Sequence, residues 1–162
     1  MQHTISVLVV NHFGVLSRIS GLFSGRGFNI ESLNVAETND PCVSRMTIVT
    51  VGDDKKIEQI IKQLNKLVDI IKVIDLTEDN FVDRELILVK MNAEPRVREE
   101  ILRIVEIFRA KVVDVSATTY TIEMTGSEGK IIGFLELLQP LGVQELVRSG
   151  RIAVSRGMKS IN

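Results

Sequence analysis

The residues best placed to do chemistry lie in one turn near the N-terminus, at positions 11–14. Residues 4–10 form a short apolar run rich in β-branched side chains, which predicts a buried strand. Beyond the turn, Val15, Ile19 and Leu22 recur at steps of three and four residues, which predicts a helix. The first N–H groups of a helix lack a carbonyl partner and carry the positive end of its dipole. A helix start exposed here would bind a carboxylate or a phosphate, although Asn and Gly are also ordinary turn residues that need no ligand to explain them.

Other residues that could do chemistry form weaker patterns. His3 and His12 lie near the two ends of the predicted strand, and no Cys, His or Asp spacing supplies the further ligands of a metal site. Residues 126–130 have glycines too closely spaced for a phosphate loop, and Ile131 follows where that loop needs Ser or Thr. Cys42 has no base paired with it in the sequence. With no catalytic residue and no metal ligand assigned, the sequence favours a binding or regulatory module.

Composition limits the partners. The chain has 162 residues, enough for one large or two small domains, and 44% of them are hydrophobic, which excludes a disordered chain. Its net charge of -1 gives no general attraction to nucleic acid or to an anionic membrane. A single cysteine excludes an internal disulfide. We find no signal peptide and no apolar run long enough to span a bilayer, so we expect a cytoplasmic protein.

The elements that position the turn form a repeated pattern. In the first half, strands are expected at 3–10, 28–37, 43–51 and 70–76, with helices at 15–25 and after a cap near Asp53. This order is the βαββαβ, or ferredoxin-like, arrangement, in which two helices cover one face of an antiparallel sheet. The other face is expected to be bare, free to meet solvent, a ligand or another subunit.

The same order is predicted to repeat in the second half. Strands are expected at 84–92, 111–117, 119–125, 143–147 and 151–155, with one helix starting near Pro95 and another capped by Ser127. The predicted fold class is therefore α+β, with two tandem ferredoxin-like modules. The predicted divisions are a first domain at 1–78, a linker at 79–83 and a C-terminal ferredoxin-like domain at 84–162.

Two other functions use this topology. RNA-binding modules stack bases on aromatic residues of the central strands, but residues 44–51 contain none and Tyr120 stands alone in the second module. Acylphosphatases hold phosphate with an arginine in the first strand–helix loop. Residues 11–14 contain no arginine, and Arg18 lies a turn into the helix. Both functions are disfavoured.

The motifs of the chain resemble one family. Asn11-His12-Phe13-Gly14-Val15-Leu16-Ser17-Arg18, followed by Gly21-Leu22-Phe23-Ser24-Gly25-Arg26-Gly27-Phe28-Asn29-Ile30-Glu31-Ser32-Leu33, resembles an ACT domain, a small amino-acid-sensing module. Nearly the whole chain is similar to the regulatory small subunits of acetolactate synthase (acetohydroxyacid synthase). This likeness is carried by Ser44-Arg45-Met46-Thr47-Ile48, Gln63-Leu64-Asn65-Lys66-Leu67-Val68, Arg84-Glu85-Leu86 with Leu88-Val89-Lys90, and Ser155-Arg156-Gly157.

The resemblance implies a subunit with no catalytic site of its own. It would raise the activity of the large catalytic subunit, which carries thiamine diphosphate, magnesium and FAD and condenses pyruvate with pyruvate or 2-ketobutyrate. It would also confer feedback inhibition by valine in branched-chain amino acid biosynthesis. Valine would bind between the ACT domains of a homodimer. Asn11, Gly14 and Asn29 match family positions whose substitution typically abolishes valine sensitivity.

The expected effector site comprises Asn11, His12, Phe13, Gly14, Val15, Leu16, Asn29 and Ile30. The helix-start N–H groups suit the carboxylate of valine, and the two Asn amides suit its polar groups because each amide both donates and accepts. Ile30 and Val35 would contact the apolar tail. A stand-alone amino-acid-binding protein without an enzyme partner is the alternative.

Overall fold

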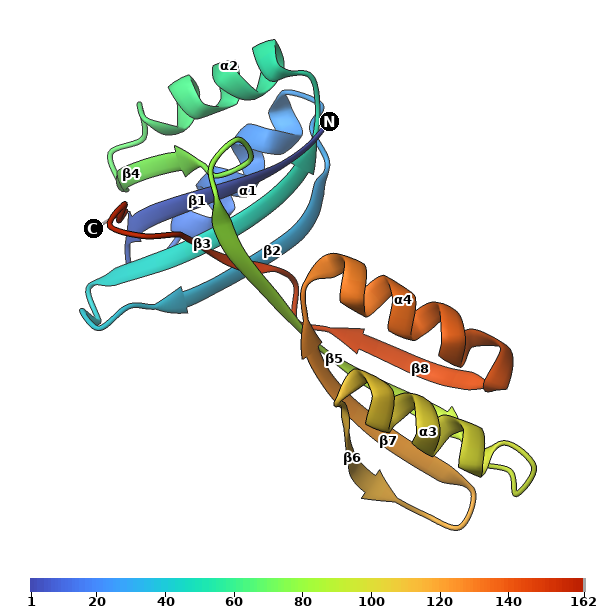
Figure 1. The fold of residues 1–162 in the computed structure, drawn as a ribbon. Helices are drawn as coiled ribbons and strands as arrows, with labels where there is room; N and C mark the ends of the chain where they lie inside the picture. The colour runs from blue at the N-terminus through green and yellow to red at the C-terminus, as the bar shows by residue number, and fades with distance from the viewer. Residues whose placement is uncertain (162) are drawn as a thin grey trace. The chain divides into compact units, whose positions relative to one another are not determined.

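The first sheet is built around β1 (Gln2–Val10), which pairs antiparallel with β3 (Val43–Val51) and β4 (Ile70–Asp75). β2 (Ile30–Glu37) pairs with the outer side of β3, so the strand order is β2-β3-β1-β4. Figure 1 shows this sheet in the computed structural model, which describes residues 1–161. β2 is thus an edge strand.

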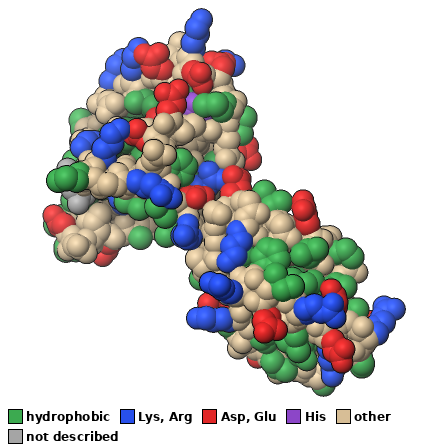
Figure 2. Space-filling model, in the orientation of Figure 1, with side chains coloured by type: hydrophobic (Ala, Val, Ile, Leu, Met, Phe, Trp, Pro, Cys, Tyr) green, Lys and Arg blue, Asp and Glu red, His purple; other side chains and the backbone are tan. Residues whose placement is uncertain are grey.

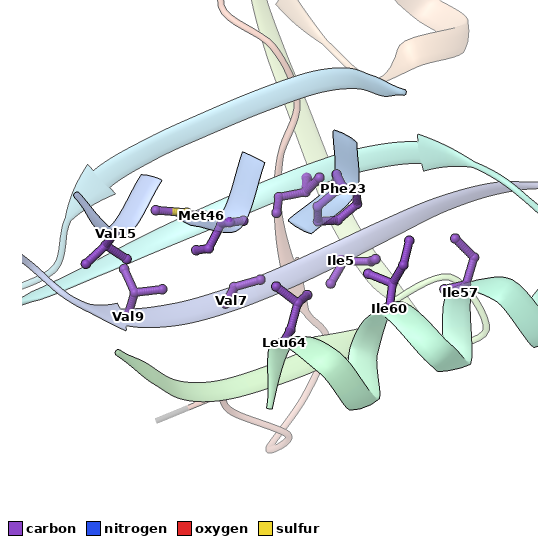
Figure 3. Packing of buried hydrophobic residues seen from close by; sticks show 11 residues of the cluster. Ile5, Val7, Val9, Val15, Phe23, Met46, Ile57, Ile60 and Leu64 are labelled. Atoms are coloured by element: carbon purple, nitrogen blue, oxygen red, sulfur yellow. The ribbon is translucent and has the colours of Figure 1, made fainter. Parts of the chain in front are cut away.

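Two helices cover one face of this sheet, α1 (Val15–Gly25) and α2 (Asp54–Leu64). The register places Ile5 opposite Ile48 on this face. Figure 3 shows how side chains from β1, β3 and the two helices pack together. Phe23 of α1 is completely buried, and burial of such a side chain contributes about 1.5–3 kcal/mol. The predicted βαββαβ order and antiparallel sheet are confirmed.

Local residues set the helix ends. Asp53 is the N-cap of α2, and its side chain accepts a hydrogen bond from the Lys56 backbone N–H at 2.9 Å. This bond lowers the pKa of Asp53, because it stabilises the carboxylate. At the end of α1, Gly27 takes a left-handed conformation with φ of 72°, which glycine adopts at little cost.

The opposite face of the first sheet is covered by the C-terminal segment, residues 151–161, so the expectation of a bare face is wrong. The backbone N–H of Arg151 donates to Ser32 Oγ at 3.0 Å, and Arg45 Nη2 donates to the Ala153 carbonyl at 3.0 Å. Ala153 and Ile161 are only 8% and 4% exposed. Burial on this face lowers the pKa of the Arg45 guanidinium.

The second unit repeats the βαββαβ order. Its elements are β5 (Phe81–Asn92), α3 (Arg98–Phe108), β6 (Lys111–Val115), β7 (Thr119–Gly126), α4 (Glu128–Leu138), a 3-10 turn η1 (Gln139–Leu141) and β8 (Val143–Arg148). The strand order is β6-β7-β5-β8. Both helices contribute to a separate core, in which Phe108 and Phe134 lie with ring centroids 5.3 Å apart.

The chain divides into units at different points from those predicted. One unit is Met1–Val82 together with the C-terminal segment, and the other is Asp83–Gly150. Residues 151–161, which were predicted to be part of the domain at 84–162, therefore belong to the first unit. Residue 162 lies outside the described residues. β5 starts at Phe81, inside the predicted linker at 79–83. β9 (Ile152–Ser155) is extended as predicted. The pattern of apolar and polar residues in this strand does not indicate which sheet the strand covers.

Two predicted helix starts also differ in detail. α3 begins at Arg98, with Val97 at the N-cap and Pro95 in the preceding turn. Ser127 is the N-cap of α4 but makes no side-chain capping bond.

Candidate functional site

The turn between β1 and α1 is held in place by Asn11. Its side-chain Nδ2 donates to the Pro41 carbonyl at 2.9 Å and to Glu37 Oε1 at 3.1 Å. Its backbone N–H donates to the Cys42 carbonyl at 2.7 Å. The amide therefore fixes the β1–α1 turn to the end of β2 and the turn that follows. It also brings the exposed Glu37 carboxylate to the edge of the candidate site.

Gly14 is the N-cap of α1 and has a φ of 85°. Only glycine adopts this left-handed conformation without strain. No side-chain hydrogen bond caps α1, and its first N–H groups lie at the positive end of the helix dipole. A helix start of this kind can hold an anion, and the effector site at these residues stays a prediction.

Two charged residues near this helix start were missed as site residues by the sequence interpretation. Asp69 is largely buried, and its carboxylate accepts from His12 Nε2 at 2.7 Å and pairs with Arg18 Nε at 2.9 Å. A Cβ atom built on Gly14 would lie 3.9 Å from Arg18 Nη2. The guanidinium is thus close to any carboxylate bound at the helix start. The sequence contains one indication of this arrangement: Arg18 follows Gly14 by four residues, which places the two residues on the same face of the helix.

The apolar members of the expected site divide into two groups. Phe13 is 99% exposed and Leu16 is 42% exposed, so both present apolar surface beside the turn. The Val15 side chain is buried in the core, which leaves only its backbone N–H for a ligand. Val35 lies on the edge strand β2 and is 42% exposed.

Asn29 and Ile30 lie at the other end of the same sheet. Ile30 is opposite Thr50, which is opposite His3 at the start of β1, whereas Asn11 follows the end of β1. The strand between these ends extends about 24 Å at 3.4 Å per residue. Asn29 Nδ2 donates to Glu31 Oε1 at 2.8 Å, beside a surface hollow of about 440 Å³ that Ile30 also lines. The predicted site residues therefore lie in two separate groups on one chain, Asn11 to Leu16 and Asn29 with Ile30, and we call each group a half-site.

Neither a group of metal ligands nor a membrane-spanning helix is found within residues 1–161. No three His, Cys, Asp or Glu side chains in this range are arranged to hold a metal ion. No helix in the same range has the length and apolar character required to cross a bilayer.

Comparison with known proteins assigns both halves of the chain. The family described as "Small subunit of acetolactate synthase" matches residues 84–157, and "AHAS small subunit-like ACT domain" matches residues 5–72. The chain belongs to the acetolactate synthase small subunit family. The predicted resemblance is confirmed, and this family name places the chain in branched-chain amino acid biosynthesis.

Several members of the acetolactate synthase small subunit family match over nearly their whole length. The "Probable acetolactate synthase small subunit" of Archaeoglobus fulgidus is 53% identical over 98% of this chain and 99% of its own. The "Acetolactate synthase isozyme 3 small subunit" of Escherichia coli is 49% identical, with 98% of both chains covered. The crystal structure of the acetolactate synthase small subunit from Thermotoga maritima has a TM-score of 0.89 at 42% identity and covers 97% of this chain and 98% of that chain.

Proposed function

We propose that this small subunit activates the catalytic subunit of acetolactate synthase in the cytoplasm and makes it sensitive to valine. Thiamine diphosphate, magnesium and FAD are on the catalytic subunit in this proposal. Residues 84–157 match the small subunit family rather than an ACT domain alone, which favours a subunit with an enzyme partner over a stand-alone amino-acid-binding protein.

The two half-sites support a valine site shared between two copies of the chain. β2 lies at the edge of the first sheet, and an edge strand pairs readily with a second strand. A two-fold axis across β2 makes the two edge strands antiparallel. When they overlap fully, Ile30 of one copy faces Glu37 of the other. Asn29 of one copy then lies beside Asn11 and Gly14 of the other, so each interface contains two complete sites.

The charges of the combined site match a free amino acid. The carboxylate of valine would bind the N–H groups at the start of α1, near the Arg18 guanidinium. Its ammonium group would lie toward Glu37, which already accepts from Asn11. Ile30 and Val35 would contact the branched tail. A methylene in such a pocket changes affinity by only about 1–3 kcal/mol, so leucine and isoleucine should bind more weakly than valine without being excluded.

The observation that carries this proposal is the separation of Asn11 and Asn29 at the two ends of an edge strand. The direct test is co-purification of the small subunit with its catalytic subunit, followed by measurement of activity with and without valine. We expect higher activity in the complex than in the catalytic subunit alone, and inhibition by valine only in the complex. A complex that forms without either change in activity would contradict the proposal.

A further inference from the structure

The second unit has an edge strand, β6, whose side chains are almost all exposed. β6 stands first in the strand order β6-β7-β5-β8, and in the described part of the chain it pairs only with β7. Figure 1 shows β6 at the margin of this sheet. Four of its five residues are exposed, and Val112 is half-buried. We call residues 111–115 the β6 edge.

Two Val side chains give the β6 edge exposed apolar surface. Val113 is 51% exposed and Val115 is 65% exposed. β-branched side chains of this kind favour extended backbone and pack well on a pleated surface. Figure 2 shows hydrophobic side chains next to charged ones on the surface of the second unit. An exposed apolar edge strand is a ready template for pairing with another strand.

A bulge places the two charges of the β6 edge on one face of the sheet. Lys111 lies opposite Glu123 of β7, and Asp114 lies opposite Thr121. Glu123 and Thr121 are two residues apart, so their side chains share one face of β7. The register shifts between Val112 and Asp114, and a bulge of this kind redirects the side chains that follow it. Lys111 and Asp114 therefore share a face although they are three residues apart.

The order of these charges makes the β6 edge complementary to a copy of itself. Two edge strands related by a two-fold axis across them run antiparallel. When Lys111 faces Asp114 of the other copy, Asp114 faces Lys111 of that copy, so one register forms two pairs of opposite charge. Val112 then lies opposite Val113 of the other copy. Pairs of opposite charge and pairs of β-branched residues both stabilise neighbouring strands.

We propose that the β6 edges of two copies of the chain pair antiparallel, with Lys111 of each copy facing Asp114 of the other. Charges and bulges at an edge strand can also keep other strands away, but like charges repel a second copy, whereas this opposite pair attracts one. The inference goes beyond the proposed function, because the pairing needs neither valine nor the catalytic subunit. It joins the second units of two copies through an interface separate from β2.

Disulfide trapping tests whether two β6 edges meet. Val113→Cys is introduced into a full-length Cys42→Ser chain, because Cys42 is an exposed free cysteine. In the proposed register Val113 lies next to the two-fold axis, so its two copies are close together. The control is Val147→Cys on β8, at the opposite edge of the same sheet, where Val147 is 52% exposed. We expect disulfide-linked dimers to form about tenfold faster with Val113→Cys. Equal rates would overturn the proposal.

Charge reversal tests the register. Lys111→Glu and Asp114→Lys are each added to the chain that carries Val113→Cys. Each should slow dimer formation about tenfold, because like charges then face each other across the two strands. A mixture of the two variants should recover the rate, since each new charge then faces an opposite charge on the other copy. The double variant Lys111→Glu/Asp114→Lys should recover it as well. Both positions are exposed, so the melting temperatures should stay equal.

The results separate strand pairing from simple proximity. Equal cross-linking in every charge variant would show that some other contact, such as the one proposed at β2, brings the second units together, and the pairing of β6 edges would be wrong. Slower cross-linking in both single variants without recovery in their mixture would also contradict it. All measurements use the full chain without valine or catalytic subunit, so failure of the proposed function would leave their outcome unchanged.

Discussion

Arg18 and Asp69 form an ion pair of 2.9 Å beside the start of α1, although they lie on different elements of the first unit. The other oxygen of the same carboxylate accepts from His12 Nε2 at 2.7 Å. Asp69 thus orients two basic side chains next to Gly14, where the carboxylate of valine is proposed to bind. Its own side chain is only 8% exposed, so a ligand would feel its effect mainly through Arg18 and His12.

The first prediction concerns the Asp69→Asn variant. The amide keeps the size of the side chain but removes the charge that holds Arg18 and His12, so we expect valine affinity to fall about tenfold, or ~1.4 kcal/mol. Calorimetric titration with valine measures this change. Asp114→Asn, an exposed acid in the second unit, should bind valine as the wild type does. Equal affinities for all three proteins would show that the pair does not support the site.

The second prediction concerns Gly14. Gly14→Ala should weaken valine binding because φ of 85° strains any residue with a Cβ atom, at a cost of about 1–2 kcal/mol. Gly14→Asp should abolish binding, since it adds a carboxylate where the ligand's own carboxylate is expected. The matched control is Gly21→Ala, which meets no atom within 4 Å and should raise the stability of α1. Calorimetry with valine compares the three variants, and retained affinity in Gly14→Asp would contradict the proposed carboxylate position.

The third prediction tests whether one site uses two chains. Asn11→Ala and Asn29→Ala homodimers should each lack every intact site, because each site needs one residue from each copy. When the two variants are mixed and exchange subunits, every heterodimer should have an intact site at one of its two positions. About one in four of all sites in the mixture should then be intact. The stoichiometry of valine binding in the mixture measures this recovery. No recovery despite confirmed exchange would mean that Asn11 and Asn29 do not contribute to a shared site.

The fold could be predicted largely because local patterns and tertiary contacts agree. Val15, Ile19 and Phe23 recur at helical spacing, and all are buried in α1. The strand predicted at residues 43–51 is β3, which has these bounds. The turn that holds Gly14 could be predicted because a strand, a turn and a helix follow one another in the sequence.

The contacts that were missed depend on the three-dimensional arrangement. Asp69 meets Arg18 only because β4 pairs with β1, and no spacing in the sequence reports that. The separation of Asn11 from Asn29 follows from the direction of α1, which returns the chain to the start of the sheet. The position of the C-terminal segment was missed for the same reason, because the residues of a strand do not identify the sheet against which it packs.

The fourth prediction concerns that C-terminal segment. Ile161 is 4% exposed and lies with Leu8 and Val43 at a hollow on the covered face of the first sheet. Ile161→Ala should lower the free energy of unfolding by about 1–3 kcal/mol, less than a central core position loses because a chain end relaxes easily. Met158→Ala, in the same segment but fully exposed, should have no measurable effect. Denaturant unfolding of the full chain compares both variants. Because the segment covers the first sheet, the lower free energy of unfolding should be seen in the transition of the first unit. Equal free energies of unfolding for Ile161→Ala and the wild type would mean that Ile161 does not hold the segment on the sheet.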